Sequence, residues 1–216
     1  MVPGTAQRDF ANVFIRQIFS ELIIPIICSK KARADHPDLR FCKCDIPNDL
    51  DTLGRFDLIF SNACLHWIPN HAELFPRIIE KLNHGGVFAV QMPLVQKAVF
   101  YKTLNELIIN DKWKKLRIIN NFHNVSPEET YDILKAVSDD VTVWDTTYYH
   151  IVQSYNAIID WYKGSGLRPY LDALSEAEKV EFLQDLLDIL ETKFSLQADG
   201  SVILKMPRMF FVATKK

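Results

Sequence analysis

Two polar residues directly follow predicted strands, the position at which open parallel sheets bind their ligands. Asp45 follows an alternating run, Leu39–Cys44, and its carboxylate can accept a hydrogen bond from a ligand. Asn62 follows a short apolar run, Phe56–Ser61, at the expected carboxyl edge of a sheet. We therefore expect both residues to bind a cofactor. The alternatives are a helix or turn cap for Asp45 and an ordinary turn residue for Asn62.

The apolar patterns predict the elements that would position these residues. Phe56–Ser61 and Val87–Gln91 are typical of buried parallel strands, and Pro69–Lys81 is typical of an amphipathic helix between them. Asn83-His-Gly-Gly86 predicts a left-handed stop after that helix. Because a strand, a helix and a strand form a βαβ unit, the fold class is α/β with a parallel sheet.

Helices predominate after Pro93. Helical spacing covers residues 97–110, 126–137, 155–163 and 175–194. Val141–Val152 alternates as a strand, and Val202–Thr214 contains two strand-like runs separated by Met206-Pro-Arg208. We expect residues 141–152 and 209–214 to complete one edge of the sheet, with the last strand antiparallel.

Composition excludes several classes of function. The chain has 216 residues, is 48% hydrophobic and has a net charge of −2, which indicates a globular domain without an electrostatic reason to bind nucleic acid or an anionic membrane. No apolar run reaches the roughly 18 residues of a spanning helix. Four irregularly spaced cysteines favour reduced thiols and a cytoplasmic location. His66 and His71 lack partners at ligand spacing, so no metal is expected.

Longer motifs resemble a known family. Phe56-Asp-Leu-Ile-Phe-Ser-Asn-Ala-Cys-Leu-His-Trp67 and Leu82-Asn-His-Gly-Gly-Val-Phe-Ala-Val90 resemble the downstream half of class I S-adenosylmethionine (SAM)-dependent methyltransferases. The segments 90–93, 146–150, 164–169 and 206–212 are similar to the branch that acts on trans-aconitate. The resemblance covers roughly residues 30–216. It implies a Rossmann-like sheet, SAM as cofactor, and a methyl ester formed on a carboxylate of trans-aconitate or a similar small polycarboxylate.

The resemblance also implies site residues. Those expected to bind the cofactor are Asp45, Ile46, Asn62, Ala63 and Leu65. Those expected to bind the substrate are His66, Trp67, Tyr149, Arg168 and Arg208, since guanidinium forks and hydroxyls fit carboxylates. The alternatives are surface charges for the two arginines, a ring on a strand face for Tyr149, and plain packing for His66 and Trp67. No catalytic residue is expected, because the acceptor oxygen is already anionic.

The family's glycine-rich turn and ribose-binding acid are not found before Lys30, where Gly4 stands alone. Back-translated residues 1–29, read in the neighbouring frame, permit Gly-Pro-Gly-Asn-Ser-Thr and then Gly-Val-Asp-Asn-Ser-Asp. We therefore hypothesise that residues 1–29 are a frameshifted reading of those motifs. We expect a helix, with helical spacing over Phe10–Cys28, or a disordered segment there. SAM binding is then expected to be weak.

The resulting domain prediction has three parts. Residues 1–29 are an aberrant N-terminal segment, residues 30–93 an incomplete SAM-binding core, and residues 94–216 a helical substrate cap plus the last sheet strands. Two other functions stay open: a methyltransferase for another small acceptor, and a non-catalytic remnant or binding protein. The oligomeric state is not predicted.

Overall fold

The computed structural model of the chain describes residues 22–23, 34–37, 41–42, 45–119, 123 and 125–216. In chain order, the elements are β1 (Leu22–Ile23), β2 (Phe41–Cys42), η1 (Leu50–Thr52), β3 (Phe56–Asn62), η2 (Leu65–Trp67), α3 (His71–Glu80), β4 (Leu82–Pro93), η3 (Val95–Lys97), α4 (Val99–Ile109), η4 (Asp111–Ile118), α5 (Pro127–Lys135), β5 (Ser138–Val152), α6 (Tyr155–Lys163), α7 (Arg168–Asp172), α8 (Glu176–Lys193) and β6 (Val202–Lys215).

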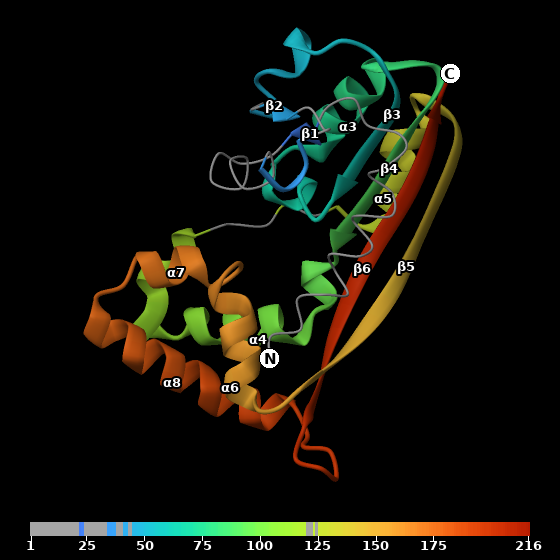
Figure 1. The fold of residues 1–216 in the computed structure, drawn as a ribbon. Coiled ribbons are helices and arrows are strands. Elements are labelled where there is room, and N and C mark those ends of the chain that lie inside the picture. Colours follow the sequence, from blue (N-terminus) through green and yellow to red (C-terminus); the bar gives the residue numbers. More distant parts are fainter. Residues whose placement is uncertain (1–21, 24–33, 38–40, 43–44, 120–122, 124) are drawn as a thin grey trace.

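The main sheet has the strand order β3-β4-β6-β5 (Figure 1). β3 and β4 pair in parallel, with α3 between them in the chain, which confirms the predicted βαβ unit. β6 runs antiparallel to both β4 and β5, as predicted for the last strand. The α/β fold class is therefore confirmed.

The described residues form two hydrophobic cores, and β6 contributes residues to both. One core joins α3 and α5 to one face of the sheet around Phe75, Phe88 and Phe211. The other joins α4, α6 and α8, which Figure 1 shows gathered away from the C-terminus. Met209 belongs to the first core and Met206 to the second, so Arg208 lies where the two cores meet.

Serine caps explain the starts of three helices after β4. Ser126 and Ser175 each form a capping box, in which the side chain accepts from the backbone N–H of the glutamate three residues later. The Ser154 side chain accepts from Ala157 N–H and starts α6. These local signals are why α5, α6 and α8 agree with the helices predicted from residues 126, 155 and 175.

The structure corrects the prediction of two separate runs in Val202–Thr214, because β6 is one continuous strand. Pro207 fits within it because its carbonyl accepts from Leu94 N–H at 2.9 Å. The main-chain polar groups of Pro207 thus point to the β4 side of β6. Because β4 ends at Pro93, no strand residue on that side requires the N–H that proline lacks.

The predicted left-handed stop also has a different role. α3 ends at Glu80, and Gly85 has a φ of +73° inside β4. The register between β3 and β4 shifts there, from Phe56–Leu82 to Leu58–Val87. Gly85 therefore belongs to a bulge rather than to the end of the helix.

The structure overturns part of the predicted helix over Phe10–Cys28. Leu22–Ile23 forms β1 and pairs in parallel with Phe41–Cys42, inside the strand predicted over Leu39–Cys44. The rest of that helix, and the frameshift hypothesis for residues 1–29, lie outside the described residues. Of the helices in the described ranges, none has the length and apolarity required to span a bilayer.

Candidate functional site

The carboxyl end of β3 presents Asn62, an exposed residue, to one face of the sheet. Its register partner on β4 is Gln91, and Ala63 N–H donates to the Gln91 carbonyl at 2.8 Å. The Gln91 Nε2 atom is buried and has no hydrogen-bond partner among the described residues. A buried amide donor without a partner is costly, so Gln91 is a second candidate for ligand binding at this edge.

Asp45 lies in a turn. Its backbone N–H donates to Asp49 Oδ2 at 2.8 Å, and Asn48 Nδ2 donates to Asp45 Oδ2 at 3.0 Å. A turn cap would require the Asp45 carboxylate to accept from a backbone N–H, whereas here it accepts from the Asn48 side chain. The Asp45 side chain is exposed, so Oδ1 can accept from a ligand. The neighbouring Ile46 packs against the core of the sheet.

The segment after β3 forms η2, which contains three predicted site residues. Leu65 is buried in the core of the sheet, and its carbonyl accepts from His71 Nε2 at 2.9 Å. His66 is also buried, and its carbonyl accepts from His123 N–H at 2.8 Å. Trp67 is 41% exposed, with its ring centroid 4.9 Å from that of His66. η2 therefore fixes one imidazole inside and one indole at the surface.

Arg208 interacts electrostatically with a group of aromatic side chains near the point where the two cores meet. Its guanidinium is half-buried, and burial lowers its pKa. Among the described residues, no carboxylate lies within ion-pair distance of it. The groups that interact with its charge are three phenols and two imidazoles. We call this set the Arg208 cluster: Arg208, Tyr101, Tyr148, Tyr162, His66 and His150.

Strand register places three of these residues on one face of the sheet. On β6 and β5, Arg208 pairs with Thr146. Two residues further along β5, Tyr148 pairs with Met206, and His150 then pairs with Leu204. Residues two apart on a strand share a face, so Arg208, Tyr148 and His150 lie on one side of the sheet. Asn62 and Gln91 lie on this same face through the pairs Gln91–Phe210 and Pro93–Arg208. One face of the sheet thus carries Asn62 and Gln91, the cofactor candidates, together with Arg208, the substrate candidate.

Two predicted substrate residues lie elsewhere. Tyr149 is on the opposite face of β5 from Tyr148 and is 61% exposed, with Lys205 Nζ 5.8 Å from its ring centroid. Arg168 begins α7 on the surface, and its Nε lies 3.6 Å from Asp172 Oδ2. Of the predicted substrate residues, His66 and Arg208 thus interact electrostatically, whereas Arg168 and Tyr149 lie outside the Arg208 cluster.

Sequence reasoning missed Tyr101, Tyr162 and Gln91. Tyr101 and Tyr162 come from α4 and α6, and a helical tyrosine in an apolar stripe has the pattern of ordinary core packing. Gln91 had a usable signal, since it is the one polar residue in the buried run of β4 before Pro93. A polar side chain at the end of a buried strand is the pattern that would have found it.

Buried His66 predicts a pH-dependent stability. Burial, Arg208 and His71 lower its pKa from 6.5 to about 4. Between these values the unfolded chain takes up a proton that the folded chain does not, so stability falls as the pH falls from 6.5 towards 4. Between pH 7 and pH 5, the free energy of unfolding measured with urea should therefore fall by about 2 kcal/mol less in His66→Gln than in the parent. His84→Gln, at an exposed histidine, is the control and should match the parent. An equal loss in both variants would contradict the assignment.

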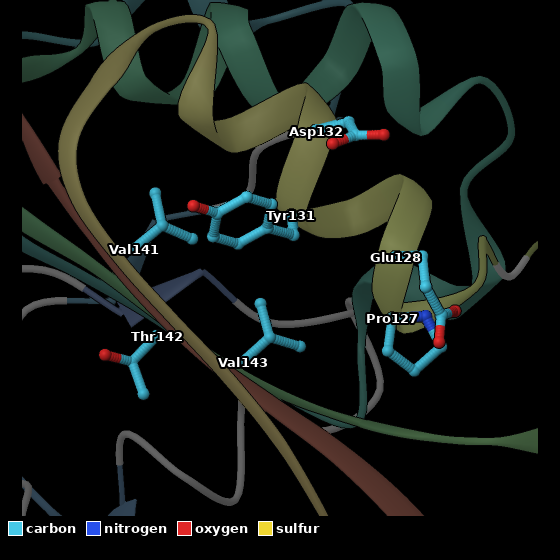
Figure 2. A pocket seen from close by; sticks show the side chains of 7 residues that line it. All are labelled: Pro127, Glu128, Tyr131, Asp132, Val141, Thr142 and Val143. Carbon is cyan, nitrogen blue, oxygen red and sulfur yellow. The ribbon is translucent and has the colours of Figure 1, made fainter.

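An open groove of about 520 Å³ lies between α5 and β5, away from the Arg208 cluster. Figure 2 shows the Tyr131 ring beside Val141 and Val143, with the Asp132 carboxylate turned away from them. None of the predicted site residues lines this groove. Within the described part of the chain, no group of three or more His, Cys, Asp or Glu is placed to hold a metal ion.

Comparison with known proteins assigns the family. No protein-family model matches the chain. The chain is 38% identical over 191 residues to the trans-aconitate 2-methyltransferase of Escherichia coli O9:H4 (strain HS), which covers 86% of the chain and 72% of that protein. The enzyme of the same name from Escherichia coli (strain K12 / DH10B) matches to the same extent.

A solved structure shows the same fold. A crystal structure described as a methyltransferase from Bacillus halodurans C-125 has a TM-score of 0.57 at 12% identity, covering 96% of this chain and 88% of its own. The shared sheet and helices agree with the fold predicted from the βαβ unit and the methyltransferase motifs. The identity to the curated relatives, over most of both chains, goes beyond fold, and the chain belongs to the trans-aconitate 2-methyltransferase family of the class I SAM-dependent methyltransferases.

Proposed function

We propose that this chain transfers a methyl group from SAM to a carboxylate of trans-aconitate or a similar small polycarboxylate, forming a methyl ester. The observation that carries the proposal is Arg208, a half-buried cation without a carboxylate partner among the described residues. The names of the relatives, which specify trans-aconitate, support the same substrate class.

The Arg208 cluster has the composition of a carboxylate site. A guanidinium offers two parallel N–H donors that match the two oxygens of a carboxylate. Burial raises the pKa of Tyr101 and Tyr162 and lowers that of His66 to about 4, so these three side chains are neutral near pH 7. They leave the Arg208 charge uncompensated, and an anionic ligand would relieve the cost of burying it.

Methyl transfer requires little acid–base chemistry from the protein. When bound, SAM supplies an electrophilic methyl group on its sulfonium. A carboxylate oxygen is already anionic, so no general base is needed, and the residues of this chain contribute by orienting the acceptor and limiting water. Arg208 would hold one carboxylate of the acceptor while another faces the methyl group. This division of roles explains why a substrate with several carboxylates suits the site.

The described residues fit the adenine end of SAM. Asp45 Oδ1 can accept from the adenine amino group, Gln91 Nε2 is a buried donor without a partner, and the exposed Asn62 amide lies on the same face as Gln91. Ile46, Ala63 and Leu65 supply apolar surface beside them. The sequence offers no glycine-rich turn before Gly54 for the methionine end. We therefore expect weaker SAM binding than in a chain that carries this turn.

Two measurements test the proposal. Calorimetric titration with SAM tests cofactor binding, and mass spectrometry after incubation with SAM and a panel of trans-aconitate, citrate and succinate tests for methyl esters. A monomethyl ester of trans-aconitate is the expected product. Ester formed on citrate or succinate but not on trans-aconitate would keep the reaction and change the acceptor to another small polycarboxylate. Binding of an acid without any ester would favour the non-catalytic alternative, and neither binding nor ester would overturn the proposal.

The remaining expectations stay predictions. The frameshift hypothesis for residues 1–29 is tested by the nucleotide sequence at the Ser29-Lys30-Lys31 codons, where an upstream alternative frame is expected. We place the protein in the cytoplasm because of its few, irregularly spaced cysteines. The absence of a nucleic-acid or membrane partner rests on the near-neutral charge alone.

A further inference from the structure

Gly166 lies in the turn between α6 and α7, and it is buried against a tyrosine. A Cβ atom at this position would overlap the Tyr101 hydroxyl oxygen and lie 3.0 Å from the Cε1 and Cζ atoms of that ring. Its φ is not in the left-handed region, in contrast to Gly85 and Gly200. The backbone conformation therefore suits any residue, and the space for Tyr101 is the reason that a glycine is required here.

The turn cannot easily move away from the ring. Ser165 N–H and Leu167 N–H both donate to the Tyr162 carbonyl, each at 3.0 Å. The ring of Tyr162 in turn packs edge-on against Tyr101 at 5.3 Å, and it stacks on Phe100 at 3.6 Å. Tyr162 thus holds the turn that contains Gly166 through its carbonyl. Its ring packs against Tyr101, which fills the space next to Gly166.

Tyr101 packs against the core that contains Tyr162 and Met206, and Met206 lies two residues from Arg208 on the same face of β6. The Tyr101 phenol also interacts electrostatically with Arg208. Burial and the neighbouring Tyr162 raise the pKa of Tyr101, so its hydroxyl stays protonated and can donate a hydrogen bond. A neutral donor beside a half-buried guanidinium does not neutralise the cation, and it adds a second direction from which an anion can be bound.

We propose that the Tyr101 hydroxyl binds the acceptor carboxylate together with Arg208, and that Gly166 is the positioning residue that gives the Tyr101 ring room to do so. This inference rests on the proposed function, since it names a second residue that contacts the same acceptor. It also assigns a reason to the second glycine of Gly164-Ser-Gly166 that backbone conformation does not supply.

The test is calorimetric titration of trans-aconitate into the full chain and five variants. Tyr101→Phe should weaken binding about tenfold, because a hydrogen bond to a charged group is lost. Gly166→Ala should weaken it at least as much by displacing the ring. Gly164→Ala is the matched control: nothing lies within 4 Å of a Cβ there and its φ is −78°, so binding should stay within about twofold.

The double variant Gly166→Ala/Tyr101→Phe separates positioning from a structural role. Both single changes remove the same hydroxyl contact, so the double variant should bind no more than about twofold weaker than Tyr101→Phe. Additive losses would show that Gly166 acts through the backbone and would overturn its positioning role.

Two further outcomes keep the inference distinct from the proposed function. If Gly166→Ala fails to fold, Tyr101→Phe decides alone, and unchanged binding in that variant overturns the inference. If the parent and Tyr101→Phe bind trans-aconitate equally well and Arg208→Gln does not bind it, the proposed function stands and this inference fails. If the parent binds no trans-aconitate, both fail.

Discussion

Replacing Phe211 by alanine is expected to lower the free energy of unfolding by about 3–5 kcal/mol. Phe211 is 1% exposed, and its ring centroid lies 5.3 Å from that of Phe75 and 5.2 Å from that of Phe88. The alanine would leave a cavity between α3 and the sheet that these large, fixed rings cannot close. Because domains of this size are stable by roughly 5–15 kcal/mol, the variant should be studied at low temperature.

The neighbouring Phe210 is a matched control on the other face of β6. Its ring stacks on Trp144 at 5.3 Å, and Trp144 is 44% exposed. Removal of the Phe210 ring should therefore cost less than about 1.5 kcal/mol in the same urea titration. Similar losses in both variants would show that both faces of β6 are equally buried, which would contradict the core assigned here.

Local sequence patterns were sufficient for most of the fold. The helix expected over residues 155–163 is α6 to the residue, because a serine cap and an apolar stripe coincide. The parallel pairing of β3 and β4 followed from a βαβ unit that has few alternative topologies. The continuity of β6 through Pro207 could not be predicted, because it depends on where β4 ends. The five-residue α7 is too short to show a helical period.

The candidate site was predictable only in part. Asn62 and Arg208 carry signals along the chain: a polar residue at the end of a buried strand, and an arginine in an apolar run. Arg168 carried an equal signal in sequence, and only the structure shows it paired with Asp172 on the surface. Tyr101 is positioned by packing against Tyr162 and Gly166, which are far from it in sequence, so no local pattern marks it.

Arg208→Gln is expected to weaken trans-aconitate binding about 10- to 100-fold, with SAM affinity unchanged within about twofold. Glutamine retains one amide donor but loses the charge and the fork of donors. Arg208→Lys should fall between glutamine and the parent, since it keeps the charge without the fork. Calorimetry with each ligand separately measures both effects.

Arg168→Gln provides the control, because this exposed arginine already has Asp172 as a partner and should not affect either ligand. Stability supplies a second criterion. A half-buried guanidinium without a carboxylate partner costs free energy in the unliganded protein, so Arg208→Gln should unfold at the same temperature as the parent or higher. A variant that lost acceptor binding and stability together would show that Arg208 holds the two cores in place. Loss of binding in Arg168→Gln alone would move the acceptor site to α7.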